Sequence, residues 1–325
     1  GLNGNSFAIT GVGDASNLAS RFVQQNSPLT SVTGLAIGAS SNGGISSNYQ
    51  LSVLSSSVSV TPKPITISGF GIASKVYDGN TTATIGSAGT LPGVYAGDDV
   101  SIDTSAFVGV FDNKNVGTAH TVTVSGLGIG GNQRNNYSFT APTTALGTIT
   151  RLNSVTWTGG ATGNWFDPAN WAGGAVPDLS NVAGVSIPTG VTVTFDTTAA
   201  VSPANASQAV NINSLGTAGT LNQVNGALAV GAGGIALQAL TQSGGTLTNA
   251  GATTLSSYNQ SGGSFSGTGN FSTAQLTQTN GSTALQGTLT VTQSYVQGLA
   301  GSISVGGNTS ITATSGGVVL GNLNT

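Results

Sequence analysis

Charged side chains, the groups most able to carry out chemistry, are few, and all of them lie before Thr197. The chain has nine Asp, no Glu, six Lys or Arg, one His and no Cys. Asp98, Asp99 and Asp103 lie within six residues and could offer carboxylate oxygens to Ca²⁺. The same grouping is typical of a solvated turn, which is the interpretation we favour. The sequence therefore predicts no resident metal and no other cofactor, with these three aspartates as weak calcium candidates.

Catalytic arrangements are equally scarce. We expect His120, the single histidine, to occupy an exposed strand position, and no Ser or acid is placed around it to support a catalytic triad. Lys75 and Lys114 each lie near Asn residues, so either lysine could form an intramolecular isopeptide crosslink, although sequence spacing alone cannot show that such a bond forms. Glycan cleavage on a repeat scaffold needs paired carboxylates, or Asp clustered with Lys or Arg, and the C-terminal repeats have neither. We therefore expect that the chain is not an enzyme.

A glutamine recurs five times near the C-terminus, at intervals of 19, 18, 18 and 19 residues. The column consists of Gln223, Gln242, Gln260, Gln278 and Gln297. An apolar residue stands two places before each glutamine, and a glycine follows three places after each of the first four. A second marker keeps nearly the same period at Gly251, Gly269, Gly287 and Gly307. Such a period is typical of a stacked solenoid, in which each rung buries its core against its neighbours.

The glutamine column has two interpretations. Alternation along a strand puts each glutamine on the same face as the apolar residue two places earlier, which favours an inward or corner position. Stacked amides can hydrogen-bond to one another along the solenoid axis, so we interpret the column as a structural ladder. The alternative is a ligand-binding stripe, for instance for glycans.

Composition predicts an all-β protein. Charged residues make up 5% of the chain, and the last 129 residues carry none. Val, Ile and Thr are abundant while Glu and Met are absent, which favours strands over helices. No apolar run approaches the roughly 20 residues of a membrane-spanning helix, and the scarcity of Lys and Arg argues against nucleic acid as a partner. The absence of Met, even at position 1, indicates a piece of something longer.

Two related segments, 1–65 and 66–150, precede the repeats. Each has an alternating apolar strand, a Gly/Asn turn and an Asn-Tyr pair that opens another strand, at Asn48-Tyr49 and at Asn136-Tyr137. The first copy is truncated, because it has no counterpart of the residues directly after Lys75. The Thr-Pro-Lys-Pro linker at 61–64 holds the chain extended. We expect two small β-sandwich-like modules.

The second module carries a family resemblance. Residues 75–83, Lys-Val-Tyr-Asp-Gly-Asn-Thr-Thr-Ala, resemble the opening of the YDG repeat found in filamentous-haemagglutinin-like bacterial exoproteins. Residues 97–100 and 111–117 and the Asn136-Tyr137 strand extend the resemblance, whereas residues 147–151 lack the Pro-Lys-Pro joint, as in the last repeat of an array. The resemblance implies a large adhesin displayed on Gram-negative bacteria, often exported by two-partner secretion, and implies no catalytic activity.

All three tryptophans, Trp157, Trp165 and Trp171, lie in the next segment. Their stretch is similar to a motif that often precedes β-helical passenger regions in bacterial adhesins. An end rung exposes apolar core and strand edges, which bulky rings could cover. We assign residues 151–200 to a Trp-rich cap with the first strands, and residues 201–325 to a parallel β-helix with ~18-residue rungs. Its right-handed sense is implied by the resemblance, and about six or seven rungs spaced at ~4.8 Å give a length of ~30 Å.

These observations predict a structural and adhesive segment of a large secreted bacterial surface protein, which acts as stalk and surface-presenting scaffold outside the cell. The implied partners are a host or bacterial surface glycan or protein, or a matrix, and an outer-membrane transporter during export. One alternative is a self-assembling extracellular filament subunit that polymerises through solenoid ends or strand exchange. Another is a glycan-binding β-helix.

Overall fold

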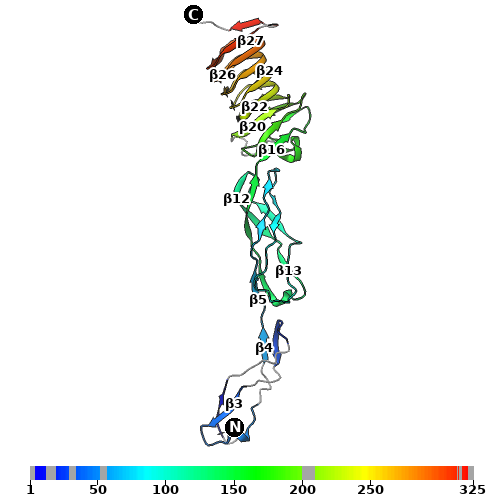
Figure 1. Cartoon of the computed structure of the whole chain (residues 1–325), viewed down its shortest axis with the longest axis vertical. Helices are drawn as coiled ribbons and strands as arrows, with labels where there is room; N and C mark the ends of the chain where they lie inside the picture. The colour runs from blue at the N-terminus through cyan, green and yellow to red at the C-terminus, as the bar shows by residue number, and fades with distance from the viewer. Residues whose placement is uncertain are drawn as a thin grey trace. The chain divides into compact units, whose positions relative to one another are not determined.

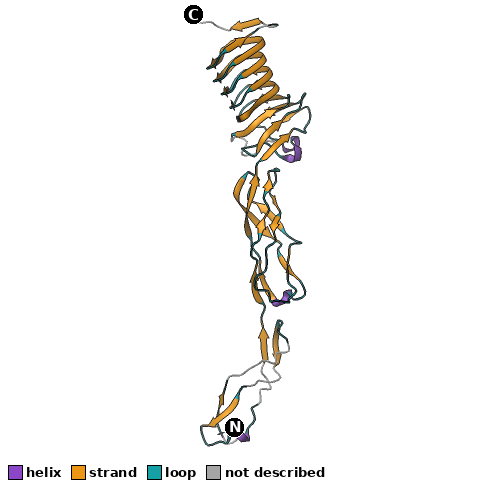
Figure 2. Ribbon diagram, viewed as in Figure 1, coloured by secondary structure: helices purple, strands orange, loops and turns teal. Residues whose placement is uncertain are grey.

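The computed structural model describes residues 4–11, 20–28, 34–51, 57–199, 209–312, 314 and 317–320. The prediction of an all-β fold is confirmed, with 57% strand and 5% helix (Figure 2). No described helix is long and apolar enough to cross a membrane. The chain forms two compact units: one contains Gly1–Phe70, Ser87–Val108 and Val124–Thr143, and the other contains Gly71–Gly86, Gly109–Thr123 and Thr144–Thr325.

The first unit consists of short paired strands. The antiparallel pairs are β1 (Phe7–Thr10) with β3 (Ala36–Ser40), β2 (Gln24–Pro28) with β4 (Ser57–Val60), and β10 (Ser101–Asp103) with β13 (Gly128–Gly130). In contrast, β5 (Lys63–Thr66) lies parallel to β14 (Tyr137–Thr140). Two 3₁₀ turns, η2 (Ser46–Asn48) and η3 (Arg134–Asn136), directly precede Tyr49 and β14. Residues 29–33 and 52–56, which the predicted first module includes, lie outside the described residues.

The second unit begins with a five-stranded sheet. Its order is β7 (Lys75–Val76), β15 (Thr144–Thr150), β12 (Gly117–Ser125), β11 (Val108–Phe111) and β8 (Thr82–Ala83), and β6 (Gly71–Ile72) pairs separately with β9 (Ile85–Ser87). Along β12 the side chains alternate, so that every second one is buried. The core of this sheet includes Tyr77, Phe111, Val122 and Ile149, each at most 2% exposed.

The rest of the second unit is a parallel β-solenoid of about six turns, as predicted (Figure 1). Its first strands are β16 (Leu152–Thr156), β17 (Thr162–Asn164), β18 (Val182–Ser186), β19 (Thr192–Phe195), β20 (Val210–Gly216) and β21 (Thr220–Gln223). The later strands are β22 (Ala227–Gln242), β23 (Thr246–Asn249), β24 (Thr253–Gln260), β25 (Ser264–Gly267), β26 (Phe271–Leu285), β27 (Leu289–Val305), β28 (Thr309–Ile311) and β29 (Gly317–Leu320). Parallel pairing starts at β16 with β18, inside the predicted cap segment, while residues 201–208 lie outside the described part of the chain.

Each regular rung contributes to three stacked strand columns. One column runs from β21 through the ends of β22 and β24, so that Leu221 stacks on Leu240 and then on Tyr258. A second runs through β23 and β25, and a third through the starts of β24 and β26. Inward side chains of all three columns fill the core, as Leu247, at 0% exposure, does from β23. The sequence period is therefore the length of one complete turn of the solenoid.

Glycines three places after the glutamines form one corner of the rung. Gly245 and Gly263 have φ angles of 73° and 69°, in the left-handed region that L side chains rarely adopt. A Cβ at Gly245 would lie 2.4 Å from the carbonyl oxygen of Gly226, and one at Gly263 would lie 2.6 Å from that of Gly245. The corner therefore requires glycine both for its backbone angle and for the close stacking of successive rungs.

Candidate functional site

Four of the five predicted glutamines form a continuous hydrogen-bonded ladder inside the solenoid. Gln242 Nε2 donates to Gln223 Oε1 at 3.2 Å, Gln260 Nε2 to Gln242 Oε1 at 3.1 Å, and Gln278 Nε2 to Gln260 Oε1 at 2.7 Å. Each of these amides also donates to a main-chain carbonyl of the following rung, as Gln260 does to Ser282 at 3.0 Å. All four side chains are 0% exposed. A ligand in solvent therefore cannot reach them.

Gln297 occupies the next place in the column but binds differently. Its Nε2 donates to the Gly301 carbonyl at 3.2 Å, and its Oε1 accepts from the Tyr295 hydroxyl at 2.7 Å. The strand register shifts by one residue immediately after Gln297, so Asn280 pairs with Ala300. Gln278 Oε1 has no hydrogen-bond partner among the described residues. The bulge therefore ends the ladder at the fourth glutamine.

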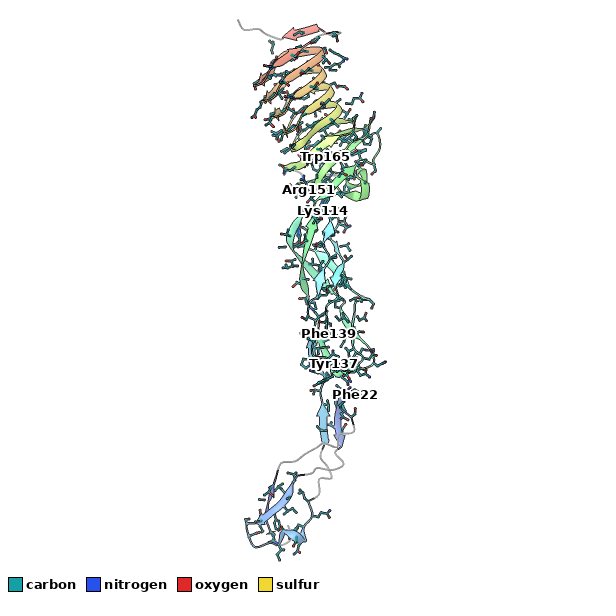
Figure 3. The ribbon with its side chains drawn as sticks, in the orientation of Figure 1. Phe22, Lys114, Tyr137, Phe139, Arg151 and Trp165 are labelled. Carbon is teal, nitrogen blue, oxygen red and sulfur yellow. The ribbon has the colours of Figure 1, made fainter. Side chains whose placement is uncertain are left out.

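The three predicted cap tryptophans form one buried aromatic cluster at the start of the solenoid (Trp165 in Figure 3). Trp157, Trp165 and Trp171 are 3%, 0% and 2% exposed. Trp171 makes edge-to-face contacts with Trp157 and Trp165, with ring centroids 5.1 Å and 5.2 Å apart, and Trp165 contacts Phe195 at 5.3 Å. Each indole N–H donates to a main-chain carbonyl. The rings thus bury a large apolar area without leaving a polar group unpaired.

A buried polar network, here named the second joint, connects the YDG-like sheet with the cap. It consists of Tyr77, Lys114, Val116, Asp178 and Asn181. Lys114 Nζ lies 2.7 Å from Asp178 Oδ2 and donates to the Tyr77 hydroxyl at 3.0 Å. The Tyr77 hydroxyl donates to Asp178 Oδ1 at 3.1 Å, and Asn181 Nδ2 donates to the same oxygen at 2.7 Å. The Asn181 side-chain carbonyl oxygen accepts from the Val116 N–H at 2.8 Å.

Burial decides the electrostatics of the second joint. The side chain of Asp178 is 3% exposed and that of Lys114 is 29% exposed, so the ion pair is mostly removed from water. Burial first, and the nearby Asp178 carboxylate second, raise the pKa of the Tyr77 hydroxyl well above its usual value of 10.0. The hydroxyl therefore stays protonated and remains a donor. Removing any one of these side-chain groups would cost its neighbours in the network at least one buried hydrogen bond.

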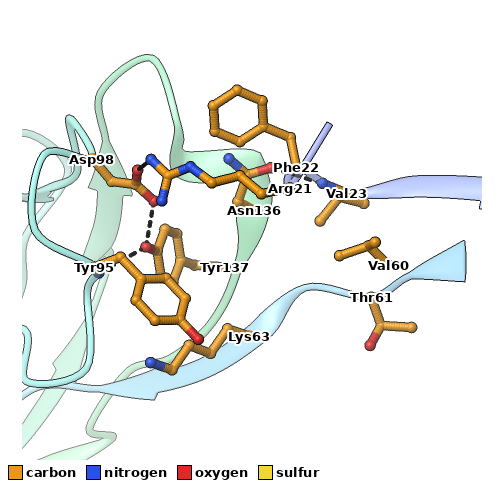
Figure 4. Close-up of a pocket in the computed structure, with 10 residues that line it drawn as sticks. All are labelled: Arg21, Phe22, Val23, Val60, Thr61, Lys63, Tyr95, Asp98, Asn136 and Tyr137. Carbon is orange, nitrogen blue, oxygen red and sulfur yellow. Dashed lines mark hydrogen bonds and ion pairs between the residues drawn. The ribbon is translucent and has the colours of Figure 1, made fainter. Parts of the chain in front are cut away.

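A similar network in the first unit, here named the first joint, consists of Arg21, Val23, Asp98, Asn136 and Tyr137 (Figure 4). Arg21 pairs with Asp98, and the Tyr137 hydroxyl donates to Asp98 Oδ2 at 2.6 Å. The Val23 N–H donates to Asn136 Oδ1 at 3.0 Å. The Asp98 side chain is 3% exposed but that of Arg21 is 58% exposed, so this ion pair is far more hydrated than the one in the second joint.

The first joint borders a cavity of about 330 Å³. Its wall includes Tyr95 and Phe22, which are 57% and 40% exposed, and Lys63. The Lys63 ammonium lies 3.9 Å from the centre of the Tyr95 ring, a cation–π contact. Partly exposed aromatic rings beside basic groups suit a ligand with both flat apolar surface and polar or acidic substituents. This pocket is the best candidate for ligand contact among the described residues.

The calcium candidates are each engaged by protein donors. Asp98 belongs to the first joint, Asp99 Oδ2 accepts from the Asn132 N–H at 3.0 Å, and Asp103 Oδ1 accepts from the Ser105 N–H at 2.9 Å. The hydrogen bonds from Ser105 hold the pKa of the Asp103 carboxyl below its ordinary value. Within the described ranges, no three His, Cys, Asp or Glu residues come together in a way that could hold a metal ion.

The expectation of an exposed His120 is wrong. His120 is 9% exposed, its Nδ1 lies 2.7 Å from Asp112 Oδ1, and its ring packs edge-on against Phe111. The hydrogen bond with His120 is the main reason why the pKa of the Asp112 carboxyl is lowered. The histidine shares the buried phase of β12 with Val122, so it is part of the core and not a surface group.

The two lysines considered for a crosslink have different surroundings. Lys75 Nζ lies 2.8 Å from Asn80 Oδ1 and 2.8 Å from Asp78 Oδ1. Lys114 contacts the Asp178 carboxylate of the second joint and not an asparagine. The isopeptide crosslink stays a prediction. Asp178 closes the Trp-rich stretch that resembles a cap motif, but sequence reasoning assigned no role to Asp178 or to Asn181.

Comparison with known families matches the YDG domain to residues 61–145 of the chain. This range includes Tyr77, Lys114, Asp98, Asn136 and Tyr137, and thus part of each joint. No curated protein and no solved structure matches the chain. A YDG domain followed by a β-solenoid fits a structural repeat protein.

Proposed function

We propose that the chain is a structural and adhesive segment of a large secreted bacterial surface protein, working as a stalk outside the cell. The observation that carries the proposal is the pairing of a YDG domain with a β-solenoid that has no charged side chain after Asp196 and contains an internal glutamine ladder. The solenoid rungs after Asp196 are held together without disulfides or ion pairs, which supports a role as a durable extracellular scaffold. Export through an outer-membrane transporter of the two-partner type belongs to the same proposal.

Adhesive contact is proposed for the pocket of the first joint, with a glycan as the first candidate ligand. The exposed Tyr95 ring could stack on the apolar face of a sugar, while Lys63 and Arg21 could hold its hydroxyl or carboxylate oxygens. A surface protein or a matrix component that presents similar groups is an alternative partner. The buried glutamine column supports no such contact.

The adhesive proposal is tested with beads coated with the purified chain. We expect the beads to bind bacterial or epithelial cells, or an array of surface glycans, and Tyr95→Ala to lower binding by about tenfold, because a stacking ring contributes roughly 1 kcal/mol or more. Val108→Ala, which truncates an exposed apolar side chain away from the pocket, is the matched control. Coated beads that bind nothing across these surfaces would refute adhesion by this segment.

A second candidate is a self-assembling filament subunit. The supporting observation concerns the last described strands of the solenoid, where Leu299, Val318 and Val319 are 74%, 49% and 52% exposed. No charged side chain there protects the strand edges from pairing with another chain. Sedimentation and negative-stain imaging of the purified chain separate the two candidates. Single particles that stay monomeric across concentrations support the stalk, whereas long regular fibres support the filament.

A further inference from the structure

The same corner of the rung requires glycine in successive turns of the solenoid, but the residue before that glycine varies. The corner glycines Gly226, Gly245, Gly263 and Gly281 have φ angles between 69° and 89°. A Cβ at Gly281 would lie 2.7 Å from the carbonyl oxygen of Gly263, so this corner also excludes other residues. Glycine precedes Gly245 and Gly263, whereas asparagine precedes Gly226 and Gly281. The fold therefore places two Asn-Gly pairs at equivalent corners.

An Asn-Gly pair can modify itself. The main-chain nitrogen of the glycine attacks the side-chain carbonyl carbon Cγ of the asparagine. The N–Cγ bond forms, the Cγ–Nδ2 bond breaks, and ammonia leaves with the N–H proton, which closes a succinimide ring. Water then opens the ring at either carbonyl and gives aspartate or isoaspartate, each with a new carboxylate. Glycine favours the attack because no Cβ shields its nitrogen.

The surroundings of Asn280 favour this reaction. Its side chain is exposed, and its Oδ1 accepts from the Gly281 N–H at 2.7 Å, which places the attacking nitrogen beside the side-chain carbonyl group. Its Nδ2, the group that leaves, has no hydrogen-bond partner among the described residues. The register of β26 against β27 shifts between Gln278 and Asn280. The main chain at this point is consequently not fixed by a regular ladder.

The amide of Asn225, at the equivalent corner, is held at both ends. Its Oδ1 accepts from the Thr197 N–H at 2.7 Å and from the Thr197 hydroxyl at 2.8 Å. Its Nδ2 donates to Asp196 Oδ1 at 2.7 Å and to the Thr198 hydroxyl at 3.3 Å. The side chain must give up these bonds before it can meet the Gly226 nitrogen. Reaction at Asn225 therefore has to wait for local opening of the structure.

The pair Asn42-Gly43 in the first unit is held in a similar way. Asn42 Oδ1 accepts from the Ser6 N–H at 3.0 Å, and its Nδ2 donates to the Gly4 carbonyl at 2.7 Å. A fourth asparagine that precedes a glycine, Asn3, lies outside the described residues. Among the described Asn-Gly pairs, the amide nitrogen is unbound at Asn280 alone.

We propose that Asn280 is a self-modification site, at which the folded chain slowly converts an amide into a carboxylate with water as the co-reactant. The fold leaves this corner open to the reaction and holds the equivalent corner at Asn225 closed. The product places a negative charge in a region that has no charged side chain after Asp196. Isoaspartate also lengthens the main chain by a single carbon atom beside the bulge that ends the glutamine ladder. This change does not depend on the adhesive function.

The experiment follows the purified full chain during incubation for several weeks at mildly alkaline pH, which helps the attacking nitrogen to lose its proton. Chymotrypsin, which cleaves after Leu276 and Leu285, then releases residues 277–285, in which Asn280 is the only asparagine. Mass spectrometry measures the fraction in which OH has replaced NH₂, and fragment ions locate the change at Asn280 or Asn225. We expect Asn280 to react at least about tenfold faster than Asn225, because a held side chain reacts only from opened states.

Matched controls separate the effect of the fold from that of the sequence. In guanidinium chloride both pairs are unfolded, so their rates should agree within about threefold. Asn280→Gln should abolish the fast reaction, because the longer side chain must close a larger ring. Asn259→Gln, at an exposed asparagine that no glycine follows, should leave it unchanged. A rate at Asn280 no higher than that at Asn225 in the folded chain, or a difference that persists in guanidinium chloride, would overturn the proposal.

Discussion

The solenoid and the second joint satisfy buried polar groups in opposite ways. The ladder uses neutral amides, and those after Gln223 are bonded both to the rung before and to the rung after, as Gln260 is. The joint uses an ion pair between Lys114 and Asp178, surrounded by Tyr77 and Asn181. The ladder repeats without a desolvated charge, so it can extend over many rungs. The joint concentrates charge at one place, where it can fix how two different folds meet.

This difference predicts that the two regions will respond differently to mutation and to pH. The glutamine ladder contains no ionisable group, whereas the second joint contains three: Tyr77, Lys114 and Asp178. Loss of one interior ladder member removes hydrogen bonds from partners on both neighbouring rungs, while loss of one member of the second joint removes them from a single cluster. Four substitutions test that contrast, beginning with the most damaging one.

Gln260→Leu should destabilise the solenoid most, by about 3–4 kcal/mol, because a buried amide deprived of its partner costs roughly 1–3 kcal/mol and several are affected. Gln260 bonds to Gln242 and Ser282, and accepts from Gln278. Leucine keeps a similar volume, so the loss reports hydrogen bonds and not a cavity. Urea unfolding followed by circular dichroism measures it. Asn259→Ala, at an exposed neighbour, is the control and should have little effect; equal losses would contradict the ladder.

Lys114→Ala should destabilise the second joint by about 2–3 kcal/mol, since it leaves the carboxylate of Asp178 buried without its cation. This expected loss of stability is smaller than the loss from breaking a fully buried ion pair because the Lys114 side chain is 29% exposed. Combining it with Asp178→Asn should recover part of the loss, because the remaining group is then neutral. Thermal unfolding of the single and double variants measures the coupling. A double variant less stable than the single one would show that charge is not the cause.

Alkaline pH should destabilise the second joint because the Tyr77 hydroxyl loses its proton there. Its pKa is raised in the folded state above the ordinary value of 10.0, so the stabilisation is complete below about pH 10 and declines as the pH rises further. Tyr77→Phe should cost about 1 kcal/mol at neutral pH by removing one hydrogen-bonding hydroxyl. The variant should also lose less stability than the wild type above about pH 10. Melting temperatures at pH 8 and pH 11 test this, and parallel profiles would exclude the hydroxyl as the cause.

Arg21→Ala should have the smallest effect, under about 1 kcal/mol, because its side chain is 58% exposed and water screens the pair. High salt should reduce even this difference. The measurement is thermal unfolding at low and high ionic strength. A loss as large as that from Lys114→Ala would mean that the two joints are energetically alike despite their different burial.

The repeating part of the fold could be predicted from the sequence because its contacts are periodic. Successive rungs place Leu240, Tyr258 and Leu276 in register, so equal spacing in sequence becomes vertical stacking in space. The end of the ladder also has a signal. Gly281 follows Gln278 by three residues, whereas its partner Gly301 follows Gln297 by four, and the extra residue forms the bulge that changes the bonds of Gln297.

The joints could not be predicted, because their contacts are long-range and occur once. Lys114 and Asp178 are 64 residues apart, and no local pattern connects them. His120 is a different case. It alternates in phase with Val122 and Val124, so the sequence does indicate a buried position, which the polarity of the imidazole obscures. The phase of a strand is better evidence than the polarity of one side chain.

The ladder also has a direction. In every bond between two glutamines the Nε2 donor belongs to the rung nearer the C-terminus and the Oε1 acceptor to the rung nearer the N-terminus, from Gln242 to Gln278. These bonds therefore all run the same way along the solenoid axis, so the two ends of the column are chemically different. Two such solenoids could continue one column only by stacking head to tail. Any fibre that continues this ladder from one molecule to the next would consequently be polar, with distinguishable ends.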